Sequence, residues 1–140
     1  MGRILAIDYG RKRTGLAVTD PMQMIATGLD TIPSHTVIDF LKAYFAKEQV
    51  DEVVVGYPLQ MNNTPSESVT FVNAFAKSFG KHFPDRVLQF ADERFTSKMA
   101  FQAMIDGGLK KSRRQDKELV DKISATIILQ SYLELKQNKQ

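Results

Sequence analysis

The sequence predicts an α/β fold in which a five-stranded mixed sheet is flanked by helices. Short apolar runs fit strands that are buried on both faces, and other segments place apolar residues at helical spacing. Three strands come first along the chain, followed by helix, strand, helix, strand and two helices. The first three strands would pair antiparallel, and the last two would join parallel to the first through right-handed crossovers.

The N-terminal segment predicts a hairpin with an acidic residue at the rim of the sheet. Residues 4–7 form a continuous apolar run that ends at Asp8 and Gly10, and residues 14–19 form the second strand. A carboxylate just past a buried strand is held rigidly, which suits a metal ligand or a reacting group. The alternative is that Asp8 and Gly10 are only turn residues.

Turn signals and apolar periodicity predict the remaining elements. A third strand is expected at residues 24–32, and Thr36 is expected to cap a helix that begins at residue 37. A capping box at residues 64–67 opens the next helix. The other predicted elements are strands at residues 53–56 and 86–91, a helix ending at residues 107–108, a loop at 109–116 and a last helix at about 117–136.

Composition places the chain among ordinary globular proteins, as one domain of residues 1–140. Hydrophobic residues make up 43% and charged residues 25%, and no apolar run is long enough for a transmembrane helix. The absence of cysteine excludes disulfides, thiolate metal sites and cysteine nucleophiles. Because a strand is predicted to start almost at the N-terminus, a signal peptide is not expected, and a cytoplasmic location is the default.

One acidic residue of the last helix lies among apolar neighbours. Asp121 shares a helical stripe with Ala125, Ile128 and Tyr132, and burying an unpaired carboxylate costs several kcal/mol. An ion pair to a lysine or an arginine, or an exposed first turn, would remove that cost. A divalent cation shared with Asp8 and with the acidic pair at residues 92–93 would also remove it.

A shared cation would indicate hydrolysis of phosphodiesters. Carboxylate oxygens are the ligands that Mg²⁺ or Mn²⁺ prefers, and two such ions can activate water and stabilise a leaving oxygen. Zinc is disfavoured because the chain has no cysteine and its two histidines, His35 and His82, are expected to be separate surface residues. Spacing alone does not choose between Asp92 and Glu93, because consecutive strand residues face opposite sides.

Four motifs in the same order resemble the YqgF family, and the resemblance covers nearly the whole chain. These bacterial proteins have a ribonuclease H-like fold and are described as pre-16S ribosomal RNA nucleases and, earlier, as Holliday junction resolvases. The chain departs from the family in having Asn62-Asn63 where an Asp/Asn-Gly pair is common, and Ser124 for a frequent alanine. The motifs are Ile4-Leu5-Ala6-Ile7-Asp8-Tyr9-Gly10 with Gly15, Gly56-Tyr57-Pro58-Leu59, Asp92-Glu93-Arg94-Phe95-Thr96-Ser97, and Val120-Asp121-Lys122-Ile123-Ser124-Ala125 with Ile128-Leu129-Gln130.

The resemblance implies a role for each matching residue. Asp8, Glu93 and Asp121 would be the catalytic metal-site residues, with two Mg²⁺ or Mn²⁺ ions as cofactor. Glu93 is thereby selected over Asp92, and Arg94 would lie beside the metals, where a guanidinium suits a bidentate phosphate contact. The implied reaction matures the 5′ end of the small-subunit ribosomal RNA in ribosome biogenesis.

Basic residues from two segments are expected to contact nucleic acid, although the net charge is only +3. Such runs are otherwise solvated loops. Tyr9 and Tyr57 are the nearest candidates for base stacking, and no aromatic-rich platform is evident. The basic residues are Arg11, Lys12 and Arg13 in the first hairpin loop, and Lys110, Lys111, Arg113 and Arg114 before the last helix.

Several alternatives stay open on the sequence alone. Fold and motifs do not separate structured RNA, such as pre-16S rRNA, from branched DNA, such as a four-way junction. A catalytically silent nucleic-acid-binding module is a further alternative, and the chain can be a monomer or a weak homodimer. Asp8-x-Gly10 with Gly15 also resembles the phosphate loop of actin-like ATPases, but those proteins need two such domains and this chain has no P-loop.

Overall fold

A computed structural model of the chain describes residues 2–57, 69–92 and 117–138. The predicted capping box at residues 64–67, the helix ending at residues 107–108 and the loop at 109–116 lie outside the described residues. The elements are β1 (Arg3–Tyr9), β2 (Arg13–Thr19), β3 (Ala26–Pro33), η1 (Ser34–Thr36), α1 (Val37–Lys47), β4 (Val50–Tyr57), α2 (Val69–His82), β5 (Leu88–Asp92) and α5 (Lys117–Asn138).

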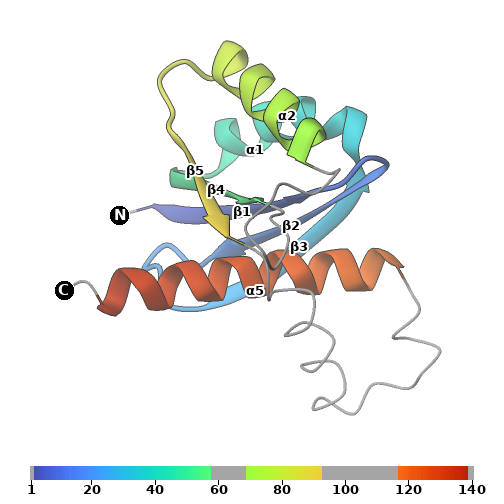
Figure 1. The fold of residues 1–140 in the computed structure, drawn as a ribbon. Coiled ribbons are helices and arrows are strands. Elements are labelled where there is room, and N and C mark those ends of the chain that lie inside the picture. Colours follow the sequence, from blue (N-terminus) through green and yellow to red (C-terminus); the bar gives the residue numbers. More distant parts are fainter. Residues whose placement is uncertain (1, 58–68, 93–116, 139–140) are drawn as a thin grey trace.

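The strands form one mixed sheet in the order β3-β2-β1-β4-β5. β1 pairs antiparallel with β2, and β2 pairs antiparallel with β3. β4 is parallel to β1, and β5 is parallel to β4. The predicted five-stranded mixed sheet is therefore confirmed, with β1 as its central strand (Figure 1).

Helices cover both faces of the sheet (Figure 1), which explains why β1 reads as a continuous apolar run. Leu5 and Ile7 point to the face covered by α1 and α2 and belong to one buried cluster. Ile4 and Ala6 point to the other face, where they pack against the apolar residues of α5. All four are fully buried, as expected for a strand between two helical layers.

Two sequence predictions were wrong in detail. β3 begins at Ala26 rather than at residue 24, because the Asp20 carboxylate accepts hydrogen bonds from three backbone N–H groups of the preceding loop, which fix it as a turn. Thr36 does not cap α1 with its side chain. Its hydroxyl instead donates to the carbonyl of Pro33, inside the 3-10 turn η1 that leads into the helix.

Among the helices that the structure describes, none has the length and apolarity that a membrane crossing requires.

α5 lies directly against the backbone of Gly15 in β2. A Cβ atom added at Gly15 would lie 2.1 Å from the carbonyl oxygen of Asp121 and 2.5 Å from its carbonyl carbon. Real Cβ atoms do not approach backbone atoms so closely, so any side chain at residue 15 would push α5 away. The position of α5 therefore requires glycine at residue 15.

We expect Gly15→Ala to lower the free energy of unfolding by about 3 kcal/mol, because the added methyl group overpacks a contact between backbones. Urea unfolding followed by circular dichroism measures the change. Gly80→Ala is the matched control, since nothing lies within 4 Å of a Cβ at that position of α2. This control should be stabilised by up to about 1 kcal/mol, the helix preference of alanine over glycine. Equal midpoints for Gly15→Ala and wild type would contradict the close approach.

Candidate metal site at the end of the central strand

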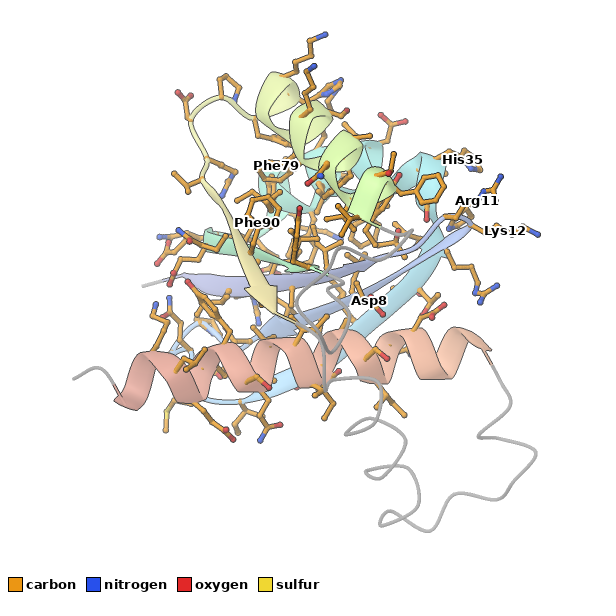
Figure 2. All side chains as sticks on the ribbon, viewed as in Figure 1. Asp8, Arg11, Lys12, His35, Phe79 and Phe90 are labelled. Atoms are coloured by element: carbon orange, nitrogen blue, oxygen red, sulfur yellow. The ribbon has the colours of Figure 1, made fainter. Side chains whose placement is uncertain are left out.

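Asp8 lies near the end of β1 on the face that α5 covers. It follows Ile4 and Ala6 in the alternation of strand side chains, and both of these pack against α5. Figure 2 shows Asp8 in the layer between the sheet and α5. Its neighbour in the sheet register is Gly15, the glycine on which α5 rests. One strand pairing therefore holds both the acid and the glycine that admits the helix.

Asp121 reaches this place from α5. Because its own backbone carbonyl lies over Gly15, Asp121 is the residue of α5 nearest to the position opposite Asp8. The two carboxylates are close enough for the charge of Asp121 to affect the ionisation of Asp8. The sequence prediction that Asp8 and Asp121 converge is thus supported by the geometry.

The surroundings of Asp8 disfavour its ionised form. Burial is the larger cause, and the negative charge of Asp121 the second, of a rise in the pKa of Asp8 from 3.8 to about 7. Within the described part of the chain no side chain or backbone N–H donates a hydrogen bond to the Asp8 carboxylate. An ionised, half-buried acid without a partner among the described residues is costly, and a bound cation would lower that cost.

Asp121 has a partner of its own. Arg13 Nε donates to Asp121 Oδ2 at 2.9 Å, and this pair joins β2 to α5. Of the ion pairs that the sequence left open, the structure therefore has the one to an arginine, whereas the Lys122 side chain packs beside Gly28. Arg13, predicted only as a contact to nucleic acid, also serves as the counter-ion of Asp121.

The donor set fits a hard divalent cation. It consists of two carboxylates, of which Asp121 pairs with the Arg13 guanidinium, so that a negative charge on Asp8 has no partner among the described residues. Oxygen-only donors of this kind suit Mg²⁺ or Mn²⁺ and not zinc. His35 and His82 are exposed, as predicted, and His82 Nδ1 is 2.9 Å from the carbonyl oxygen of Ser78.

The third predicted ligand cannot be placed. Glu93, Arg94 and the basic cluster Lys110, Lys111, Arg113 and Arg114 lie outside the described residues, as does the side chain of Asp92. The backbone of β5 ends at Asp92, next to Tyr57 of β4, at the same edge of the sheet as Asp8. Within the described residues no three acidic or histidine side chains form a metal-binding group, so the three-carboxylate site remains a prediction.

Ser34 fixes the loop that carries Arg11, Lys12 and Arg13. Its hydroxyl donates to the carbonyl of Gly10 at 2.6 Å, and its backbone N–H donates to the carbonyl of Lys12 at 2.9 Å. Because the hydroxyl proton of Ser34 is used in this way, the Thr14 hydroxyl must donate in their 2.8 Å contact. Sequence reasoning missed Ser34, and the only available signal was a polar residue directly after a strand.

The two tyrosines considered for base stacking are engaged with the protein. Tyr9 stacks on Phe75 with ring centroids 4.6 Å apart, and Tyr57 meets Phe90 edge to face at 5.3 Å. Both tyrosines also pack against the core between the sheet, α1 and α2. Their rings are therefore used mainly to hold the fold together.

Comparisons with known proteins found matches over nearly the whole chain. A family model described as "RuvX: Holliday junction resolvase" matches residues 2–135. A protein of Flavobacterium johnsoniae named "Putative pre-16S rRNA nuclease" is 62% identical over 136 residues, which are 97% of this chain and 99% of the relative. A protein of Phocaeicola vulgatus with the same name is 59% identical over 136 residues, 97% of this chain and 98% of the relative.

A solved structure has the same fold. RuvC of T. thermophilus, in a structure described as a complex with a Holliday junction substrate, matches with a TM-score of 0.53. The match covers 97% of each chain at 15% sequence identity, so the likeness concerns the fold alone. The predicted ribonuclease H-like fold is thereby confirmed.

We expect Asp8→Asn to stabilise the metal-free protein at alkaline pH. Folding raises the pKa of Asp8 from 3.8 to about 7, so its contribution to stability is complete below pH 4 and is lost as the pH rises through 7. Above pH 8 the variant should exceed the wild type by up to about 4 kcal/mol in free energy of unfolding, and the difference should vanish below pH 4. Urea unfolding in EDTA from pH 4 to 9 measures this.

Asp39→Asn, which removes a carboxylate at an exposed position of α1, is the control for that series. A difference between Asp8→Asn and wild type that stays constant with pH would contradict an uncompensated buried acid at residue 8.

We expect Arg13→Gln to strengthen Mn²⁺ binding while lowering stability by about 1 kcal/mol, because the guanidinium offsets part of the charge that attracts the ion. Titration calorimetry with Mn²⁺ and urea unfolding measure the two effects. Arg3→Gln is the matched control, since Arg3 pairs with Glu48 at 3.3 Å with similar exposure at the other end of β1. Unchanged Mn²⁺ affinity in Arg13→Gln would mean that Arg13 does not influence the ion.

Proposed function

The chain belongs to the RuvX family, also called YqgF, and we propose that it is a divalent-metal-dependent nuclease acting on precursor 16S ribosomal RNA. The observation that carries the proposal is the Asp8 carboxylate, which is placed beside Asp121 across Gly15 and has no compensating partner among the described residues. Such a pair of acids gains most from a bound cation. The substrate is inferred from relatives about 60% identical over nearly the full chain, whose printed names specify pre-16S rRNA.

Each site residue has a proposed role. Asp8 and Asp121, with Glu93 as the resemblance implies, would hold two Mg²⁺ or Mn²⁺ ions. Such ions, when bound, activate a water molecule and stabilise the leaving oxygen of a phosphodiester. Arg13 holds the Asp121 carboxylate by Nε, so its terminal nitrogens can meet a phosphate oxygen.

Cationic side chains around the acids would bind the polyanion. Arg11 and Lys12 are exposed at the loop tip, and Ser34 fixes the backbone that carries them. A small number of phosphate contacts would make affinity fall steeply with salt. The substrate, a ribosomal RNA precursor, would place the protein in the cytoplasm. The other proposed contacts are Arg94, Lys110, Lys111, Arg113 and Arg114.

A second candidate is cleavage of four-way DNA junctions. Two observations favour it, namely the description of the family model and the fold shared with RuvC, whose structure is described with a Holliday junction substrate. RNA and DNA cleavage use the same metal chemistry, so the geometry of the acids is compatible with both. We favour RNA because the relatives named for it are far more similar to this chain than RuvC is.

We expect Asp8→Asn to lower the rate of cleavage at least about a hundredfold, because it removes a metal ligand without changing the volume of the side chain. Labelled precursor rRNA and a four-way DNA junction are tested side by side with Mg²⁺, with Mn²⁺ and with chelator. Asp39→Asn is the matched control and should cleave like the wild type. Turnover of precursor rRNA by Asp8→Asn at the wild-type rate would refute the assignment, and cleavage of the junction alone would favour the second candidate.

A further inference from the structure

The first turn of α2 lies against the loop between β1 and β2. Two contacts join them along one line, because Tyr9 stacks on Phe75 at 4.6 Å and the Arg11 guanidinium lies 5.5 Å from the ring centroid of Phe71. Phe71 and Phe75 are four residues apart and share a face of α2, and Arg11 lies in the turn that follows Tyr9. The two contacts therefore lie one after the other between α2 and the end of β1 with its loop. Tyr9 with Phe75 is the inner contact, and Arg11 with Phe71 is the outer one.

The outer contact, between Arg11 and Phe71, is more exposed to solvent than the inner one. Phe75 is buried, whereas Phe71 keeps 38% of its surface exposed and Arg11 is exposed as well. An exposed phenylalanine on the first turn of a helix contributes little to the core. A cation against an aromatic ring at the surface also contributes only about 0.5–1 kcal/mol. Stability of the fold therefore gives little reason for this pair.

We propose that Arg11 and Phe71 form a subsite that binds an unpaired nucleotide of the substrate next to the acidic site. This proposal rests on the proposed nuclease function. Aromatic rings and arginine planes bind unpaired bases by stacking, and every base offers a π-face, so such a subsite does not require a particular sequence. The adjacent Lys12, exposed at the same loop tip, supplies a charge for the phosphate of that nucleotide.

The position of the pair relative to Asp8 suits this role. Three residues of backbone span at most about 11 Å, so the Cα atoms of Asp8 and Arg11 lie no farther apart than that. Figure 2 shows Arg11, Lys12 and His35 together at one end of the molecule, with Asp8 between them and the centre of the sheet. Asp8 faces α5, whereas Phe71 belongs to α2 on the other face, so a strand that reaches both would cross the edge of the sheet at the loop between β1 and β2.

The loop is also held still, which lowers the entropic cost of binding. Ser34 accepts from Thr14 and donates to Gly10 and to Lys12 on either side of Arg11. The backbone N–H of Gly10 donates to the carbonyl of Arg13 at 3.0 Å, which closes the turn. A preorganised loop loses little conformational freedom when it binds a ligand. Arg11 is thus presented from a fixed backbone.

The chain contains no tryptophan, so Phe71→Trp would introduce a single fluorescent reporter at the proposed subsite. We expect a single-stranded oligoribonucleotide to quench its emission, measured in Asp8→Asn protein without divalent metal so that the RNA stays intact. Single-stranded DNA should quench as well, and a blunt RNA duplex much less, because its bases are not free to stack. Met24→Trp is the control, since Met24 is also exposed but lies in the loop whose Gln23 donates to the carbonyl of Gly2, at the other end of β1 from Asp8.

Removal of the ring tests the contribution to affinity. Phe71→Leu should weaken single-stranded RNA binding about tenfold, with an unchanged dependence on salt, because no phosphate contact is lost. Arg11→Gln should weaken binding and also reduce the slope of log affinity against log salt by about 0.7. Affinity within twofold of wild type for Phe71→Leu, or equal quenching at positions 71 and 24, would overturn the proposal. Lower stability of Phe71→Leu without lower affinity would mean a structural contact only, and would also overturn it.

The two proposals fail in different ways. Absence of cleavage by the wild-type chain on every substrate would remove the nuclease function, while quenching at position 71 would still establish the subsite. Wild-type cleavage that is unaffected in KM and kcat by Phe71→Leu, with unchanged RNA affinity, would remove the subsite alone.

Discussion

The site depends on a contact between two stretches of backbone. Because Gly15 has no side chain, the carbonyl of Asp121 can lie directly over β2, at the position paired with Asp8. The register between β1 and β2 and the position of α5 on the sheet then determine where Asp8 and Asp121 lie. The two buried clusters on either side of β1 hold these elements together and supply the stabilisation that offsets the repulsion between the acids.

The charges at the site are balanced only in part. Arg13 offsets the negative charge of Asp121, while burial and the charge of Asp121 disfavour the ionised form of Asp8. A ligand that binds only the folded state stabilises it by mass action, so an ion that relieves this imbalance would strengthen the fold as well as supply the chemistry. If Asp8 holds the ion as proposed, the acid lowers stability in the absence of the ion and raises it in its presence.

Much of the fold could be predicted because it depends on local patterns. Apolar runs and helical periodicity predicted the strands and helices and Asp8 at the rim, connection rules predicted which strands pair antiparallel or parallel, and an acid on an apolar stripe indicated that Asp121 needs compensation. The source of that compensation could not be predicted, since Arg13 lies 108 residues away in sequence. Ser34 and Gly15 act through contacts that exist only after folding. Phe71 was missed because it lies beside the buried stripe of its helix. The signal for a binding site is the exposure of this aromatic side chain.

The central place of β1 has a consequence for motion. Its backbone amides are paired on both sides, to β2 and to β4, whereas β3 and β5 are paired on one side only among the described residues. Hydrogen exchange in such sheets is slowest at the centre, because edge strands open at lower free energy than the strands between them. Asp8 directly follows the part of β1 that is paired on both sides and stays paired with Gly15 of β2, so opening of an edge strand leaves that pairing in place.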